Sequence, residues 1–252
     1  MGEPRDTTTA GAIPDTDAIT HARAALSSYL FRGMLVGMGA TAVAIHRTTG
    51  SRALAWSFAK ARARDLTWML GVRVHVRGLE HLRGGGPFVF APNHQSHLDI
   101  LTMLAFLPGR TRFASKVELW EHPVVGAVLD TLGMVPIDRA NPERAIEALN
   151  EAGGRNESLV IFPEGKRSRD GVLAEFKKGA FVLAIRLGRP VVPVIVRGTR
   201  RLMPRGSQLT VLPGDVEIIV EPPIPTAGLT HEDRDELAAQ VRRAIEQHHT
   251  GW

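Results

Sequence analysis

The chain has 252 residues, of which 44% are hydrophobic, and this size and composition are typical of one globular domain with an ordinary core. Its 31 Lys and Arg residues exceed its 26 Asp and Glu residues, and the net charge of +5 favours an anionic partner, whether nucleic acid, a phosphorylated substrate or an acidic lipid surface. Cysteine is absent, which excludes disulfide scaffolds, thiol nucleophiles and thiolate metal sites.

The N-terminal part of the chain is expected to be a tail followed by two helices. Residues 1–15 are polar and indicate a disordered tail, without a cleavable signal peptide or a good myristoylation site. Residues 16–71 predict two amphipathic helices, separated by a break at residues 48–50. The uncharged run at residues 33–45 is shorter than the about twenty residues that cross a bilayer, so a membrane span is not predicted.

The second helix carries a broad apolar face. Its members are Leu54, Phe58, Ala61, Trp68 and Met69. Together with basic flanking residues, this face favours an element that lies in the membrane interface. The same pattern also fits helices that pack on the domain as part of its core. Asp65 falls within the face and argues against deep insertion.

A dinucleotide-binding pattern, G-x-G-x-x-A, occurs at Gly37, Gly39 and Ala42. No clear strand precedes it, and no acidic residue follows at about twenty positions, as that site requires. We interpret the pattern as a chance match or as small residues that allow helices to pack closely.

After residue 71, strand patterns alternate with helix patterns, which favours a single-domain αβ sandwich around a largely parallel mixed sheet, here assigned to residues 72–252. Strands are predicted at residues 72–76, 88–91, 111–115, 134–137, 159–162, 190–196 and 216–220, the last as an edge strand. Helices are predicted at residues 100–107, 118–132, 142–152 and 178–187. A final helix begins with a capping box at Thr230 and buries Leu237, Val241 and Ile245.

The turn between the second strand and its helix carries a candidate acid–base pair, His94 and Asp99. On one continuous helix these residues would lie about 140° apart, so they can meet only if His94 precedes the helix. Ser96 predicts this arrangement, because Ser96 and Asp99 match a capping box with Ser96 as N-cap. Asp99 would then fix the imidazole tautomer and leave the other ring nitrogen free to accept a proton from a hydroxyl.

Two other interpretations of this turn remain open. Asp99 can serve only to cap the helix, with His94 as an ordinary turn residue. Alternatively, His94, His97 and Asp99 can be metal ligands, although no second ligand cluster accompanies them and no metal is expected.

Four stretches resemble, in order, the motifs of the lysophosphatidic acid acyltransferase (1-acylglycerol-3-phosphate O-acyltransferase) family of glycerolipid acyltransferases. They are N-H-Q-S-H-L-D at residues 93–99, G-M-V-P-I-D-R at 133–139, F-P-E-G-K-R-S at 162–168 and V-V-P-V-I at 191–195. The resemblance runs from about residue 75 to residue 220. It implies an enzyme that moves a fatty acyl group from acyl-CoA or acyl carrier protein, without a cofactor, to the free hydroxyl of a lysophospholipid.

The resemblance also implies roles for individual residues. His94 and Asp99 would form the catalytic pair, and the phosphate of the acceptor would be held by Arg139, Glu164, Gly165, Arg167 and, by a looser match, Lys116. A solvated loop with an ordinary Glu–Arg pair is the alternative for residues 164–167. Lys166 stands where the family usually has Thr, so it either strengthens the grip on an anionic head group or indicates a different acceptor.

These expectations define a membrane-associated enzyme of phospholipid biosynthesis. It would lie on the cytoplasmic face of the cell membrane as a peripheral or monotopic protein, with no nucleic-acid partner. The most favoured acceptor is 1-acylglycerol-3-phosphate, which gives phosphatidic acid. The alternatives are an acyltransferase for a different lyso-acceptor, a catalytically silent lipid-binding module at the membrane surface, and a hydrolase.

Overall fold

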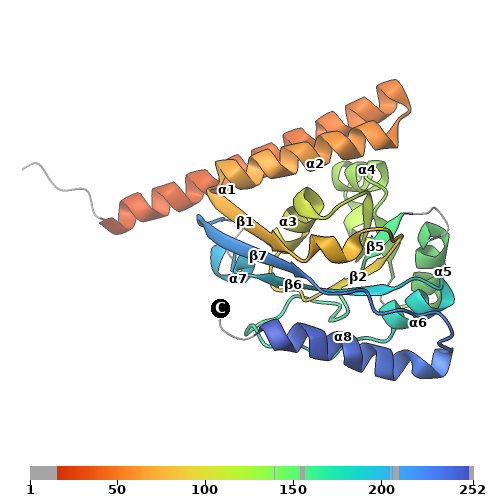
Figure 1. Cartoon of the computed structure of the whole chain (residues 1–252). Helices are drawn as coiled ribbons and strands as arrows, with labels where there is room; N and C mark the ends of the chain where they lie inside the picture. Colours follow the sequence, from red (N-terminus) through yellow and green to blue (C-terminus); the bar gives the residue numbers. More distant parts are fainter. Residues whose placement is uncertain (1–15, 139, 154–156, 205, 207–209, 250–252) are drawn as a thin grey trace, which may run out of the picture.

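A computed structural model describes residues 16–138, 140–153, 157–204, 206 and 210–249 (Figure 1). The predicted disordered tail and Arg139 lie outside the described residues. The strands are β1 (Val72–Arg77), β2 (Val89–Pro92), β3 (Thr111–Lys116), β4 (Val135–Ile137), β5 (Ser158–Val160), β6 (Val191–Arg197) and β7 (Gly214–Val220). The α-helices are α1 (Thr16–Thr49), α2 (Arg52–Met69), α3 (Leu98–Phe106), α4 (Pro123–Thr131), α5 (Pro142–Gly153), α6 (Gly179–Arg186), α7 (Thr199–Leu202) and α8 (Arg234–His249). Short 3-10 helices are η1 (Leu79–Leu82), η2 (Val117–Glu121) and η3 (His231–Asp233).

The strands form one sheet in the order β1-β7-β6-β2-β5-β3-β4, parallel except where β6 meets β7. The chain leaves β2 through α3 toward β3, but it leaves β5 through α6 toward β6. The connections of these two adjacent strands therefore run in opposite directions. Sheets of this kind bind ligands beyond the carboxyl ends of the strands at such a switch point.

The predicted αβ sandwich with a largely parallel sheet is confirmed, and alternating side chains bury both of its faces. In β6, Val192, Val194 and Val196 join the core cluster under the N-terminal helices and α3. Val191 and Ile195 join the second cluster, under α5, α6 and α8. This alternation follows from the two-residue period of a strand. Helices therefore cover the sheet on both sides (Figure 1).

The prediction that residues 216–220 form an edge strand is wrong, because β7 pairs with β1 on one side and with β6 on the other. Glu217 lies within this strand. In the fold, its carboxylate forms ion pairs with Arg77 of β1 at 2.5 Å and Arg197 of β6 at 3.2 Å. The neighbouring strands thus supply the partners that water would give at an edge.

The predicted helix at residues 118–132 is divided into η2 and α4. His122 adopts an extended conformation (φ −91°, ψ 109°), and Pro123 then begins α4. Proline favours the first turn of a helix, and it restricts the preceding residue to extended conformations. The final helix agrees with prediction: the capping box at Thr230 is present, and Leu237, Val241 and Ile245 are buried.

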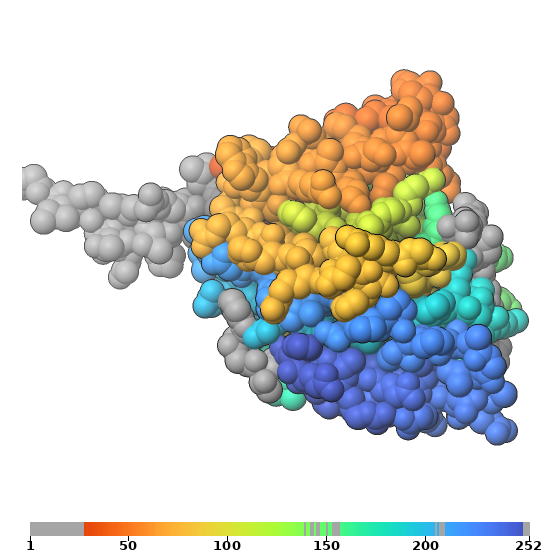
Figure 2. Space-filling view, in the orientation of Figure 1, coloured from red at the N-terminus to blue at the C-terminus, as the bar shows by residue number. Residues whose placement is uncertain are grey.

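The two predicted N-terminal helices are present as α1 and α2, which lie side by side along one flank of the molecule (Figures 1 and 2). Within α2, Ala55, Ala59 and Ala63 are buried, whereas Leu54 and Trp68 are 55% and 80% exposed. The alanines, together with Trp56 and Leu66, therefore face the domain, whereas Leu54, Trp68 and Met69 face outward. The sequence-predicted apolar face is thus largely the solvent-facing side of this helix.

Small residues also bring α1 against α4. A side chain added at Gly39 would place its Cβ 2.7 Å from Val128 of α4, and Ala42 is fully buried. This contact supports helix packing as the role of the G-x-G-x-x-A pattern. The helical stretch Ser28–Thr49 extends beyond the uncharged run, and it is long and apolar enough to cross a membrane by length and composition.

Candidate active site

The predicted meeting of His94 and Asp99 is confirmed at the carboxyl end of β2. The ring Nδ1 of His94 lies 2.8 Å from Oδ2 of Asp99, whose side chain is fully buried. Because α3 begins at Leu98, His94 lies in the turn before the helix and Asp99 lies in its first turn. If Nδ1–H donates to the carboxylate, the lone pair of Nε2 is left to accept a proton.

The predicted capping box is only half formed. Oδ2 of Asp99 accepts hydrogen bonds from the backbone N–H groups of Gln95 at 2.7 Å and Ser96 at 2.9 Å, so the carboxylate does reach back. The helix, however, has His97 rather than Ser96 as its N-cap. The Ser96 hydroxyl accepts a long 3.3 Å bond from the N–H of Leu98, and it donates to the carbonyl of Met203 at 2.8 Å. Ser96 therefore ties the turn to the segment after β6.

The ring of His94 is held on one face by Phe162, which follows β5. The two ring centroids lie 3.9 Å apart with planes inclined by 25°. The His94 side chain is only 12% exposed and borders the cavity described below. Stacking and the bond to Asp99 together fix the orientation of the imidazole.

Glu164 supports the same turn from the next strand. Its buried carboxylate accepts the backbone N–H of His94 at Oε1 (2.7 Å) and that of Ala174 at Oε2 (3.0 Å). The backbone N–H of Ser168 also donates to the carbonyl of His94 at 2.8 Å. The first and third motifs are therefore joined through backbone groups, and the predicted contact of Glu164 with a phosphate stays a prediction.

A cavity of about 640 Å³ opens beside His94 at this edge of the sheet. Part of its wall is apolar, with Ile100, Leu119, Ile137, Leu149, Ile161 and Phe162. Another part is cationic, with Lys116, Lys166, Arg167 and Lys177. One compartment therefore offers surfaces for a hydrocarbon chain and for an anion, which are the two components of a phospholipid.

Three predicted phosphate-binding residues, Lys116, Gly165 and Arg167, border this cavity. Lys116 also forms an ion pair with Glu118 at 2.9 Å. Gly165 has φ +68°, and a Cβ there would lie 3.0 Å from Cε of Lys177. Lys177 is thus brought to the site by the close approach that glycine allows.

His97 adds a second imidazole to the cavity wall. Burial lowers its pKa, and the positive charge of Arg167 and the ring of His94 lower it further. The ring is therefore neutral at neutral pH. Among the described residues, no group of three His, Cys, Asp or Glu side chains has an arrangement that could hold a metal ion.

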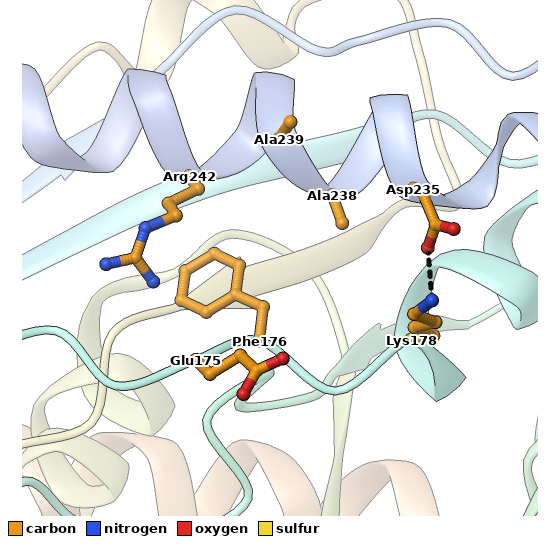
Figure 3. Close-up of a pocket in the computed structure, with 7 residues that line it drawn as sticks. All are labelled: Glu175, Phe176, Lys178, Asp235, Ala238, Ala239 and Arg242. Atoms are coloured by element: carbon orange, nitrogen blue, oxygen red, sulfur yellow. Dashed lines mark ion pairs between the residues drawn. The ribbon is translucent and has the colours of Figure 1, made fainter.

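In a second groove, beside α8, three charged side chains have partners within the protein (Figure 3). Nζ of Lys178 lies 2.8 Å from Asp235, and Arg242 lies over the ring of Phe176. The guanidinium of Arg242 also donates to the carbonyls of Leu173 and Ala174 at 3.1 and 2.7 Å. Because the N–H of Ala174 donates to Glu164, α8 supports the site through Arg242 and the Leu173–Ala174 backbone.

Thr199 contacts Asp99, and no prediction from the sequence included it. Its hydroxyl lies 2.5 Å from Oδ1 of Asp99, across a sequence separation of 100 residues. The available signal was its place directly after β6, since parallel β2 and β6 end at the same edge of the sheet.

Comparisons with known proteins find relatives of this chain. An acyltransferase family model matches residues 73–197. The chain is 40% identical over 156 residues to 1-acyl-sn-glycerol-3-phosphate acyltransferase BAT2, chloroplastic, of Brassica napus, which covers 60% of this chain and 45% of that protein. It is 30% identical over 219 residues to human 1-acyl-sn-glycerol-3-phosphate acyltransferase alpha, which covers 85% of this chain and 77% of that protein.

A solved structure shares the fold over nearly the whole chain. The crystal structure of the 1-acyl-sn-glycerophosphate acyltransferase PlsC from Thermotoga maritima matches with a TM-score of 0.76 and 28% sequence identity. The match covers 93% of this chain and 98% of that chain. By contrast, the chain spans about half the length of the chloroplast relatives that it matches, 45% and 49%.

Proposed function

The chain belongs to the acyltransferase family that includes these 1-acyl-sn-glycerol-3-phosphate acyltransferases, and we propose that it is an acyltransferase of lipids. It transfers a fatty acyl group from a thioester to the free hydroxyl of a lysophospholipid. The donor is acyl-CoA or acyl carrier protein, and the acceptor is 1-acylglycerol-3-phosphate, which gives phosphatidic acid. The observation that carries the proposal is a buried His–Asp pair beside a cavity with both apolar and cationic walls.

His94 is the general base in this proposal. With Nδ1 bonded to Asp99, Nε2 takes the proton of the acceptor hydroxyl as its oxygen attacks the thioester carbonyl carbon. The tetrahedral intermediate collapses with cleavage of the C–S bond, and the imidazolium returns the proton to the departing thiolate. Because the thioester is already activated, the reaction requires no covalent enzyme intermediate and no cofactor.

The cationic wall of the cavity takes the phosphate end of the acceptor. Arg167 offers a planar group suited to bidentate contact, and Lys116, Lys166 and Lys177 offer point charges on the same wall. Glu164 and Gly165 also shape this end of the site: the Glu164 carboxylate accepts the backbone N–H of His94, and Gly165 leaves room for the Lys177 side chain. Their own contact with the phosphate stays a prediction. The apolar wall of the cavity contacts the acyl chain.

The N-terminal helix pair brings the enzyme to the lipid. Large apolar side chains are exposed on it, notably Tyr29, Leu30, Val36, Leu54, Trp68 and Met69. We place this face in the cytoplasmic leaflet of the cell membrane, with the protein bound as a peripheral or monotopic enzyme. The buried contacts of α1 with α4, through Gly39 and Ala42, favour this arrangement over a helix that crosses the bilayer alone.

The test is acyl transfer by the purified chain. Free thiol released from acyl-CoA or acyl carrier protein is followed with and without lysophosphatidic acid and other lyso-acceptors, and the lipid products are identified. We expect thiol release to depend on the acceptor. His94→Gln should lower kcat by about a hundred- to ten-thousandfold, the range that positioned base catalysis contributes.

His231→Gln, at an exposed position on η3, is the matched control and should leave kcat unchanged. Melting curves of both variants establish that they are folded. Thiol release that is independent of any acceptor would indicate a hydrolase, and near-normal turnover of His94→Gln would rule out the assigned base. A folded wild-type protein that binds lipid without releasing thiol would indicate a silent lipid-binding module.

A further inference from the structure

Thr199 and Asp99 form a buried contact behind His94. Both residues are fully buried, and the Thr199 Oγ1 atom lies 2.5 Å from Oδ1 of Asp99. Thr199 begins α7 directly after β6, outside all four sequence motifs. The side of the carboxylate that faces away from the imidazole therefore has a partner of its own.

The chemistry of Asp99 fixes the direction of this hydrogen bond. Its Oδ2 accepts the backbone N–H groups of Gln95 at 2.7 Å and Ser96 at 2.9 Å, and it lies 2.8 Å from Nδ1 of His94. The carboxylate form has only acceptors, so it is the form that can accept these groups. The Thr199 hydroxyl must therefore donate to Oδ1.

The backbone around Thr199 is placed by contacts with the rest of the fold. Gly198 has φ +88°, and a Cβ there would lie 2.3 Å from the carbonyl oxygen of Asp215. The side chain of Asn93 donates to the carbonyl of Val196 at 3.0 Å and accepts its N–H at 2.7 Å. These contacts hold the turn that carries His94 and the segment before Thr199 together, independently of the Thr199 hydroxyl.

We propose that Thr199 is a positioning residue for the His94–Asp99 pair. Its hydroxyl holds Oδ1 so that Oδ2 stays directed at Nδ1 of His94, and it draws part of the carboxylate charge away from the imidazole. Without this donor, the carboxylate rotates more freely and stabilises the protonated imidazole more strongly. The catalytic use of this contact rests on the proposed function, whereas the contact itself is testable without turnover.

The surroundings of His94 contain other charges, which the test must hold constant. They are Asp99 and His97 from its own turn and helix, Glu164, Lys166 and Arg167 after β5, Lys177 before α6, Lys116 at the end of β3, and Asp138 after β4. None of them is altered by a substitution at Thr199. A change in the titration of His94 can then be assigned to the lost hydroxyl.

The first experiment titrates the imidazole rings of ¹⁵N-histidine-labelled protein by NMR without substrates, with His94 assigned by His94→Gln. Thr199→Val keeps the branched shape and removes the donor, whereas Thr199→Ser keeps it. We expect Thr199→Val to raise the midpoint of the His94 titration by roughly half a pH unit or more. Without the Thr199 hydroxyl, the Asp99 carboxylate interacts more strongly with the protonated imidazole. Thr199→Ser should restore the wild-type midpoint.

Thr226→Val is the matched control. Thr226 is also buried, and its hydroxyl donates to the carbonyl of Arg189 at 3.0 Å, away from the site. It should leave the His94 titration unchanged. An unchanged midpoint in folded Thr199→Val, or an equal shift in Thr226→Val, would overturn the proposal.

The second experiment measures acyl transfer across pH. Thr199→Val should lower kcat roughly tenfold through misplacement of the base, with KM little changed, and move the acidic limb of the profile to higher pH. Thr199→Ser should reverse both effects. A folded Thr199→Val enzyme with a wild-type pH profile contradicts the positioning role. Absence of transfer in the wild-type protein contradicts the proposed function instead. In that case, the NMR titration decides whether the contact acts on His94.

A measurement on the wild-type protein covers the case in which Thr199→Val does not fold. A buried hydroxyl that donates to a carboxylate exchanges its proton slowly with water and is visible by NMR. We expect such a resonance for the Thr199 hydroxyl. Threonine hydroxyls at the protein surface should not give one. A Thr199 hydroxyl proton that exchanges as fast as an exposed one would overturn the proposal.

Discussion

At the scale of single residues, the site is built from buried carboxylates that bind N–H groups. Asp99 accepts two backbone N–H groups at Oδ2, which also lies 2.8 Å from Nδ1 of His94, and Glu164 accepts one backbone N–H at each oxygen. In both cases a charge that would be costly to bury is stabilised by hydrogen bonds from the chain that it positions. The acidic residues of the first and third motifs therefore order the backbone around His94.

Glu164→Gln tests this role of the third motif. The amide of glutamine would place an NH₂ group against the N–H of either His94 or Ala174, where only an acceptor fits. We expect a loss of about 1–3 kcal/mol in the free energy of unfolding, measured by denaturant titration, and a lower kcat. KM for lysophosphatidic acid should change little.

Glu80→Gln, at an exposed position on η1, is the control and should behave as wild type. An effect of Glu164→Gln confined to KM, with unchanged stability, would instead indicate direct contact between Glu164 and the head group.

At the scale of elements, α3 is held at both ends. Its first turn carries Asp99, and its last carbonyls receive cations from α2. Arg64 donates to the carbonyl of Ala105 at 2.8 Å and lies over the ring of Phe106, while Lys60 donates to the carbonyl of Leu107. Burial, with the nearby charge of Arg64, lowers the pKa of Lys60. Positive charge at this end complements the helix dipole, so α2 stabilises the helix that presents Asp99.

Arg64→Met should weaken this attachment. We expect a loss of about 1 kcal/mol in the free energy of unfolding, from one hydrogen bond to a carbonyl and one contact with an aromatic ring. Hydrogen exchange at the amides of α3 should become faster.

The matched control is Arg62→Met on the same helix, where Arg62 forms an exposed ion pair with Asp65 at 2.8 Å. Such surface pairs contribute about 0–1 kcal/mol, so α3 should keep its protection. Equal effects of the two substitutions would mean that the contact with α3 has no special importance.

At the scale of the whole molecule, the helix pair and α8 cover opposite flanks of the sheet, as the orange and blue surfaces of Figure 2 show. Large apolar side chains are exposed on the helix pair, whereas small ones such as Ala59 face the domain. Exposed apolar area of this kind is typical of an interaction surface. In the proposed function, this flank contacts lipid while the sheet edge holds the chemistry.

Leu54→Asn combined with Trp68→Ala tests this surface. These side chains are 55% and 80% exposed, so their loss should leave the fold intact but remove apolar area from the membrane contact. At about 25 cal/mol per Å² of buried apolar area, we expect vesicle affinity to fall about tenfold or more. Co-sedimentation with vesicles of anionic and neutral phospholipid measures it.

Leu79→Asn, on η1 and 37% exposed, is the control outside the helix pair. Undiminished vesicle binding by the folded double variant would show that another surface contacts lipid.

The sequence by itself determined the strands, the turn and the relation of His94 to Asp99. Those features depend on neighbours within a few residues: apolar periodicity, a helix start, and the five-residue spacing that places His94 before the helix. The four motifs added the family because their order and spacing are also written along the chain.

Only the tertiary structure decided which segments meet. The pattern of residues 216–220 indicated a strand but could not show that arginines of both neighbouring strands flank Glu217. Likewise, the Ala-rich side of α2 is buried because small side chains permit close packing, although larger apolar residues marked the other side. Thr199 reaches Asp99 because β2 and β6 are paired in the sheet, and strand order depends on long-range packing that no local pattern encodes.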